Sequence, residues 1–122
     1  ISDDLLDGAL KYLNKTYKLN TINGGVVITK VPGVFEIPVT IATRIKKYDG
    51  FLALGCVIKG QTPHFDFISS ATTNAIMKLS TDYKKPIGNG IITCLNKKQA
   101  IVRSIKKGQE AANAVGVVLE KL

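Results

Sequence analysis

The chain has 122 residues, of which 45% are hydrophobic and 21% are charged, and this composition fits a single globular domain. No apolar run approaches the ~20 residues of a membrane span, and no signal peptide is visible, so we expect a cytoplasmic protein. The formal net charge of +8 comes from scattered basic residues without interleaved aromatic residues, which favours a solvated surface that attracts anionic substrates over a nucleic-acid interface.

The first part of the chain predicts a helix, a turn and a strand. Ser2 followed by two aspartates is typical of a helix N-cap, and apolar residues at helical spacing extend this helix to about Tyr17. After an Asn-Gly-Gly turn, the β-branched run 26–31 predicts a strand that ends at Pro32-Gly33. A capped helix at the start of the sequence also suggests that a further segment precedes it.

A second helix is predicted to begin near Pro38, because proline suits the first turn of a helix. Its buried stripe should consist of Ile41, Ala42 and Ile45.

The stretch FLALGCVIKGQTPHFDF, residues 51–67, predicts a buried strand over residues 51–58, a turn at Gly60 and a helix from Pro63 to about Tyr83. Thr62 is the expected N-cap of that helix. A glycine turn that joins a strand to a helix is a common anion site, because free N–H groups of both elements point at one spot. His64, the only histidine, lies in the first helical turn beside this candidate phosphate site. The buried helix face should carry Phe67, Ala71, Ala75 and Leu79.

The last third of the chain predicts a strand over residues 87–93, whose glycines suggest close approach of another backbone or a ligand. Asn96 is the expected N-cap of a helix with Ala100, Ile101 and Ser104 on its inner side. We expect Gly108 to interrupt this helix before a final amphipathic one. Cys56 and Cys94 have no metal-ligand spacing and are expected to be free thiols.

Helices that alternate with strands predict an α/β fold, a three-layer α/β/α sandwich with a parallel sheet. A strand upstream of residue 2 would complete a four-stranded sheet, so residues 1–122 are expected to form one domain that lacks its N-terminal strand. Ligands bind beyond the carboxyl ends of such strands. There we expect three groups to converge: Phe35-Glu36, the turn from Gly60 to His64, and Asn89.

Three motifs resemble the signatures of the lumazine synthase family: PGVFEIP at 32–38, ALGCVIKGQTPHFDF at 53–67 and QAIVR at 99–103. The resemblance covers essentially the whole chain and implies a flavodoxin-like strand order. It also implies condensation of 5-amino-6-(D-ribitylamino)uracil with 3,4-dihydroxy-2-butanone 4-phosphate to 6,7-dimethyl-8-ribityllumazine, with release of phosphate and water. This is the penultimate step of riboflavin biosynthesis, and it requires no metal and no cofactor.

The resemblance also implies roles for particular residues. His64 would be the general acid/base. The pyrimidine and the ribityl chain would be held by Phe35, Glu36, Val57, Ile58 and Asn89. The phosphate would be held by Gly60, Gln61, Thr62, Arg103 and Lys107. The chain departs from the family pattern at several places. Asn89 replaces an aromatic or aliphatic side chain, Ala111 stands where a second lysine is usual, and the usual acidic residue after the last strand is missing from Thr93-Cys94-Leu95-Asn96.

The family implies a pentamer whose active sites lie between subunits. Phe35, Glu36, Val57, Ile58, His64 and Asn89 would come from one subunit, and Arg103 and Lys107 from its neighbour. The turn at 106–108 lacks an insertion, which favours assembly of pentamers into a 60-subunit icosahedral shell. Riboflavin synthase would be a functional partner.

Two alternatives share this fold. One is a non-catalytic shell or scaffold, favoured by the changes at Asn89 and Ala111 and by the absent first strand. The other is an archaeal-type riboflavin synthase, against which the PHFDF and PGVFEIP motifs argue. A turnover assay with both substrates separates the enzyme from the scaffold.

Overall fold

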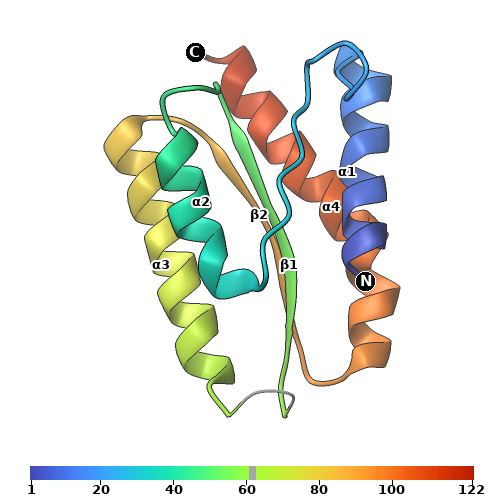
Figure 1. Ribbon diagram of the computed structural model, residues 1–122. Helices are drawn as coiled ribbons and strands as arrows, with labels where there is room; N and C mark the ends of the chain where they lie inside the picture. Colours follow the sequence, from blue (N-terminus) through green and yellow to red (C-terminus); the bar gives the residue numbers. More distant parts are fainter. Residues whose placement is uncertain (61–62) are drawn as a thin grey trace.

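The computed structural model describes residues 1–60 and 63–122, and it shows a parallel sheet with helices on both faces (Figure 1). The predicted α/β class is therefore confirmed. The elements are α1 (Ser2–Tyr17), η1 (Val34–Glu36), α2 (Ile37–Arg44), β1 (Phe51–Ile58), α3 (Phe65–Tyr83), β2 (Ile87–Cys94) and α4 (Lys97–Glu120).

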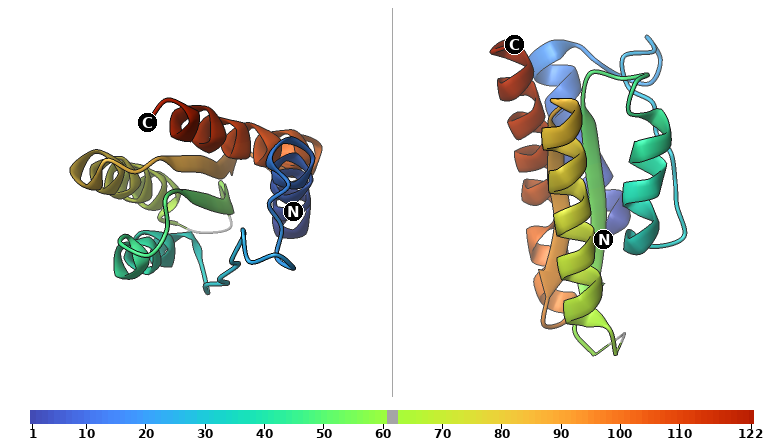
Figure 2. Two further views of the ribbon diagram at one scale, coloured as in Figure 1. Left: turned by 90° about the horizontal axis from the view of Figure 1, so that it is seen from above. Right: turned by 90° about the vertical axis from the view of Figure 1, so that its left-hand side faces the viewer.

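The sheet joins β1 to β2 in parallel, in a register that pairs Phe51 with Ile87 and Ile58 with Cys94. Successive side chains of a strand point to opposite faces, so β1 supplies two cores. Ala53 and Val57 pack with apolar residues of α2 and α3, whereas Ile58 packs with Leu5 of α1. Figure 2 shows the same division, with α1 and α4 on one side of the sheet and α2 and α3 on the other.

The predicted strand over residues 26–31 is not formed, and among the described residues the sheet has two strands. The segment is extended, but Val27 and Ile28 are 56% and 39% exposed. Val26 packs against the buried cluster of Ala9, Leu13 and Ala112 without entering the β1–β2 ladder. β-branched residues favour extended backbone, but a strand also needs a neighbour that completes its hydrogen bonds.

The predicted break at Gly108 is also wrong, because α4 is a single helix of 24 residues. Gly108 lies where α4 crosses α1, and a Cβ there would stand 2.1 Å from the carbonyl oxygen of Leu5. Gly8 of α1 has the reciprocal position, with its Cβ site 2.1 Å from the carbonyl oxygen of Ile105. The two glycines therefore allow the helix backbones to touch, and this packing outweighs the weak helix propensity of glycine.

Two side-chain hydrogen bonds extend the contact between α1 and α4. The Tyr12 hydroxyl donates to Asn113 at 2.6 Å, and the Tyr17 hydroxyl donates to Glu120 at 2.6 Å. The bond to Glu120 raises the pKa of Tyr17 to about 12. Tyr17 therefore stays a hydrogen-bond donor to Glu120 throughout the neutral range.

The helix boundaries mostly follow the prediction, with differences at the caps. Asn96 caps α4 as expected, since its side-chain oxygen accepts a hydrogen bond from the Gln99 N–H at 2.9 Å. Ser2 lies inside α1, which has Ile1 at the N-cap position and no side-chain cap. Helix α3 begins at Phe65, with His64 at the N-cap position, and the expected cap Thr62 falls outside the described residues.

The predicted buried faces are partly wrong. Phe67 is 66% exposed, and α3 buries Thr72 and Ile76 instead, one position along from the predicted stripe. Ala42 and Ile101 are also exposed. By contrast, the glycines of β2 fulfil their expectation, because a Cβ on Gly88 would stand 2.4 Å from the carbonyl oxygen of Ala111. That contact is the close approach of α4 to the sheet.

We predict that Gly108→Ala destabilises the protein by about 1–3 kcal/mol, because the added methyl group must push α1 away from α4. In an uncrowded helix the same change would stabilise by up to about 1 kcal/mol. Urea unfolding followed by circular dichroism measures the effect. Gln109→Ala, at the exposed neighbouring position, is the control and should change stability by less than about 0.5 kcal/mol. A Gly108→Ala variant as stable as the wild type would contradict the backbone contact.

Candidate functional site

A hollow of about 330 Å³ lies where η1 meets the carboxyl-terminal half of β1. Its lining includes four of the residues predicted for a substrate site, together with residues that the sequence did not single out. The lining residues are Gly33, Val34, Phe35, Glu36, Cys56, Val57, Ile58 and Ile68. Segments from three elements, η1, β1 and α3, thus enclose one space at the carboxyl end of a parallel strand, where ligands of α/β proteins bind.

Gly55 explains how η1 comes so close to β1. A Cβ at this position would stand 2.7 Å from a methyl carbon of Val34, so only glycine lets the short helix rest on the strand. The only sequence signal for this contact is a glycine inside the apolar run of β1, and the run alone does not reveal what approaches it. Without this approach, Phe35 and Glu36 would not border the same space as Val57.

Phe35 and Glu36 give the hollow an aromatic and an acidic wall. Phe35 is 56% exposed, so its ring is open to stack on a flat ligand. Glu36 ends η1 and occupies the N-cap position of α2, where the helix dipole favours a carboxylate. Within the described part of the chain the only ion pair joins Lys78 to Asp82, so no cation neutralises Glu36. Its carboxylate can accept hydrogen bonds from hydroxyl groups of a ligand.

The turn after β1 begins as predicted. Gly60 has φ +91, a left-handed conformation that side chains disfavour, and its Cβ site is open. Lys59 anchors the turn by donating its N–H to the Cys94 carbonyl at 2.9 Å. His64 is exposed at the start of α3, and its carbonyl accepts the Ile68 N–H at 2.8 Å. Gln61 and Thr62, both predicted phosphate ligands, lie outside the described residues.

Arg103 and Lys107 lie four residues apart on α4, so both point from one side of the helix. The Arg103 guanidinium donates from Nη1 to the Cys94 sulfur at 3.4 Å. Arg103 therefore reaches the carboxyl end of β2, the edge from which the Gly60 turn also leaves the sheet. However, α4 covers the face of the sheet opposite to α2 and α3, whereas the hollow opens beside η1 and α3.

Asn89 does not lie at the carboxyl edge, and that part of the prediction was wrong. It is the third residue of β2 and pairs with Ala53, five residues before the end of the strand at Cys94. Five residues of strand span about 16 Å. The Asn89 side chain is exposed and accepts the Ile91 N–H of its own strand at 3.1 Å. The structure therefore separates Asn89 from the hollow of its own chain.

Both cysteines are free, as expected, and they lie on adjacent strands at the carboxyl end of the sheet. Burial raises the pKa of the Cys56 thiol, and the neighbouring Cys94 raises it further. Cys56, which lines the hollow, is thus a neutral thiol at neutral pH.

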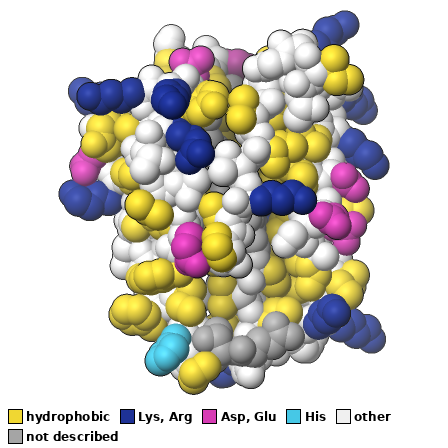
Figure 3. Space-filling view, viewed as in Figure 1, with side chains coloured by type: hydrophobic (Ala, Val, Ile, Leu, Met, Phe, Trp, Pro, Cys, Tyr) yellow, Lys and Arg dark blue, Asp and Glu magenta, His cyan; other side chains and the backbone are white. Residues whose placement is uncertain are grey.

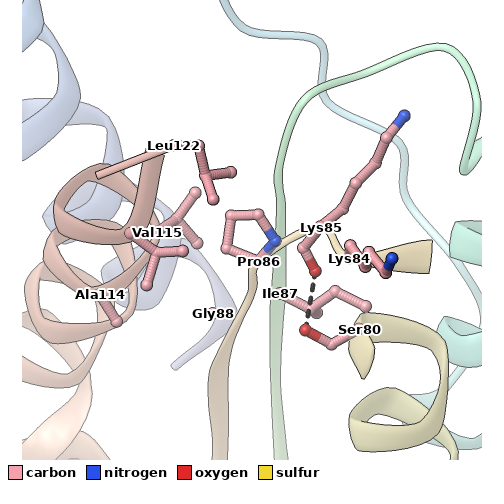
Figure 4. A pocket seen from close by; sticks show the side chains of 10 residues that line it. Ser80, Lys84, Lys85, Pro86, Ile87, Gly88, Ala114, Val115 and Leu122 are labelled. Carbon is pink, nitrogen blue, oxygen red and sulfur yellow. Dashed lines mark hydrogen bonds between the residues drawn. The ribbon is translucent and has the colours of Figure 1, made fainter. Parts of the chain in front are cut away.

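A second hollow, of about 360 Å³, lies at the opposite edge of the sheet (Figure 4). Two of its polar side chains, those of Ser80 and Lys85, already bind carbonyl groups of the protein. The Ser80 hydroxyl donates to the Lys85 carbonyl at 2.7 Å, and the Lys85 ammonium donates to the Ile45 carbonyl at 2.6 Å. The remaining walls include apolar side chains such as Pro86, Val115 and Leu122. This hollow contains none of the predicted site residues and lies at the amino ends of the strands.

The face of the molecule in Figure 3 carries no continuous basic stripe. Lys and Arg side chains on the face in Figure 3 form separate groups divided by apolar and uncharged surface. Among residues 1–60 and 63–122, no three His, Cys, Asp or Glu side chains gather as metal ligands. In the same part of the chain, every helix is too short or too polar to cross a membrane.

Comparison with known proteins adds independent information. A family model described as 6,7-dimethyl-8-ribityllumazine synthase matches residues 1–122. A protein of that name from Desulfovibrio desulfuricans is 38% identical over all of this chain and 78% of its own length. A protein of the same name from Cutibacterium acnes is 39% identical over 97% of this chain and 72% of its own length. Another, from Bartonella bacilliformis, is 43% identical over 90% of this chain and 70% of its own length.

Proposed function

Since this chain belongs to the 6,7-dimethyl-8-ribityllumazine synthase family of transferases in riboflavin biosynthesis, we propose that it forms 6,7-dimethyl-8-ribityllumazine. The substrates would be 5-amino-6-(D-ribitylamino)uracil and 3,4-dihydroxy-2-butanone 4-phosphate. The observation that carries this proposal is the hollow in which Phe35 and Glu36 face the carboxyl end of β1. It offers an aromatic wall for a pyrimidine and a free carboxylate for the alcohol groups of a ribityl chain.

The pyrimidine substrate would stack on Phe35 and receive backbone hydrogen bonds from Val57 and Ile58, at the end of β1. Its amine would attack the ketone of the second substrate and form an imine with loss of water. Phosphate elimination would follow, and the ribitylamino nitrogen would then close the ring on the remaining carbonyl with loss of a second water. His64 would move the protons, because an imidazole can both accept and donate them.

The phosphate would bind at the turn that begins with Gly60, with Arg103 and Lys107 as cationic partners. Gln61 and Thr62 remain predicted ligands at this turn. A guanidinium offers a planar fork of donors that matches phosphate oxygens, and a backbone turn at a helix N-terminus adds N–H groups. The +8 net charge would help to attract this dianionic substrate.

The active site would be shared between copies of the chain in a homo-oligomer. Arg103 and Lys107 lie on the face of the sheet opposite to the hollow, and Asn89 lies far along β2, so these three would serve the hollow of a neighbouring copy. Exposed apolar side chains on and beside α4 offer a surface for that neighbour: Leu95, Ile101, Val102 and Ile105. We further propose that the homo-oligomer is a pentamer and that pentamers assemble into a 60-subunit shell. The protein would be located in the cytoplasm and would cooperate with riboflavin synthase.

A non-catalytic scaffold is the second candidate. It is favoured by Asn89, whose exposed side chain accepts a hydrogen bond from its own strand. The departure from the family pattern at Ala111 does not support it. Ala111 is 3% exposed and packs against Gly90 of β2, so this position faces the sheet and could not present a lysine to phosphate. Turnover with both substrates, followed by lumazine absorbance, decides between the two. A scaffold would produce no lumazine.

We predict that His64→Ala lowers kcat about 10²-fold, the lower end of the usual contribution of a general acid/base, without changing the mass of the assembly. Steady-state kinetics and light scattering measure the two quantities. Asn74→Ala, at an exposed position further along α3, is the control for a substitution on the same helix. Near-normal turnover in His64→Ala would remove His64 from the mechanism.

We predict that Arg103→Ala raises KM for the phosphate substrate at least about tenfold and leaves KM for the pyrimidine unchanged, because a charge-assisted hydrogen bond contributes about 1.5–3 kcal/mol. Lys98→Ala removes one positive charge from an exposed position near the start of α4 and controls for long-range attraction. An equal rise in both variants would show that Arg103 acts only through net charge. An unchanged KM would place the phosphate elsewhere.

A further inference from the structure

We propose that Cys94 is a positioning residue, whose buried sulfur orients the Arg103 guanidinium for phosphate. This inference rests on the proposed function, in which Arg103 binds the phosphate of the substrate. Cys94 is the last residue of β2 and is 2% exposed. Its sulfur lies 3.4 Å from Nη1 of Arg103, within hydrogen-bond distance for sulfur.

The chemistry of this contact suits an anion site. Within the described residues, no carboxylate pairs with Arg103, so no neighbouring anion offsets its positive charge. A carboxylate would orient the group equally well but would neutralise it and compete with phosphate. The sulfur is a weak, neutral acceptor that uses one of the five guanidinium N–H donors. The other donors stay available for a forked interaction with phosphate oxygens.

Rigid elements hold both partners of the contact. Cys94 pairs with Ile58 in the sheet and packs in the apolar core with Leu5 and Ala100. On the helix side, the Asn96 cap and the bond from the Leu95 N–H to the Gln99 side chain at 3.0 Å fix the start of α4. Arg103 follows Gln99 by one turn. The position of the guanidinium is therefore set by the sheet and by the helix start, with the sulfur as the point of contact.

Cys94 also contacts the turn before Gly60 of its own chain, which in the proposed oligomer belongs to a different phosphate site from the one that Arg103 completes. Its carbonyl accepts the Lys59 N–H at 2.9 Å, one residue before Gly60, while its sulfur accepts from Arg103. The residue thus touches both the base of the anion-binding turn and the arginine. A change confined to the Cys94 side chain should alter the orientation of the Arg103 guanidinium and leave the backbone hydrogen bond from Lys59 intact.

The test compares Cys94→Val and Cys94→Ala, which remove the acceptor, with Cys94→Ser, which restores one. Calorimetry with inorganic phosphate on the assembled protein gives the affinity, and steady-state kinetics give KM for each substrate. We expect the Val and Ala variants to bind phosphate about five- to tenfold more weakly, with a matching rise in KM for the phosphate substrate only. Cys94→Ser should stay within about twofold of the wild type. Ile92→Val, two residues earlier on the same buried side of β2, should change neither quantity.

Two outcomes would overturn the inference, and they differ in what they say about the proposed function. Wild-type phosphate affinity in a folded Cys94→Ala or Cys94→Val variant, with weakened binding in Arg103→Ala, would reject the role of the sulfur and keep the role of Arg103. Unchanged affinity in Arg103→Ala would reject both. Circular dichroism identifies folded variants, and Cys94→Ala decides if the larger valine prevents folding.

Discussion

The parallel pairing of β1 with β2 is the interaction on which the rest of the structure depends. Its register places Ile58 beside Cys94, so both strands end at one edge. From that edge the Gly60 turn leaves toward α3, and the chain after Cys94 enters α4 through the Asn96 cap. A register shifted by one residue would turn the apolar residues of β1 to the wrong faces and carry the Cys94 sulfur away from Arg103.

The two faces of this sheet divide the proposed chemistry. The face covered by α2 and α3 carries η1 and the hollow, with groups suited to a planar, hydroxylated ligand. The face covered by α1 and α4 carries Arg103 and Lys107, which suit a phosphate. A bimolecular condensation needs both sets of groups at one place. Association of copies meets this need, since the apolar side chains exposed on α4 would at the same time be removed from water.

The sequence predicted local features well and tertiary ones less well. Strand β1 has the predicted bounds, and Asn96 caps α4 as predicted. Both features depend on residues close together in the sequence, an apolar run in one case and a capping side chain in the other. The segment 26–31 has equally strong β-branched composition but forms no ladder, since pairing depends on a neighbour elsewhere in the fold. The contact of Gly108 with the Leu5 backbone is invisible from sequence, where a glycine indicates only a break in the helix. Asn89 is the third residue both of the predicted strand 87–93 and of β2, so its grouping with the strand ends had no support from the predicted strand itself. Among site residues, the sequence grouped Phe35 with Val57 correctly in space, but it did not anticipate Gly55 or the Cys94 contact.

The central claim, that one catalytic site takes residues from two copies, is tested most directly by mixing two inactive variants. His64→Ala and Arg103→Ala chains are unfolded, combined in equal amounts and refolded together, and lumazine formation is compared with that of each variant alone. If His64 and Arg103 come from different copies, random assembly restores both residues in roughly a quarter of the sites, and activity rises well above either parent. If both residues of a site come from one chain, no mixed site is complete, and the absence of any recovery in properly assembled mixtures would contradict the account.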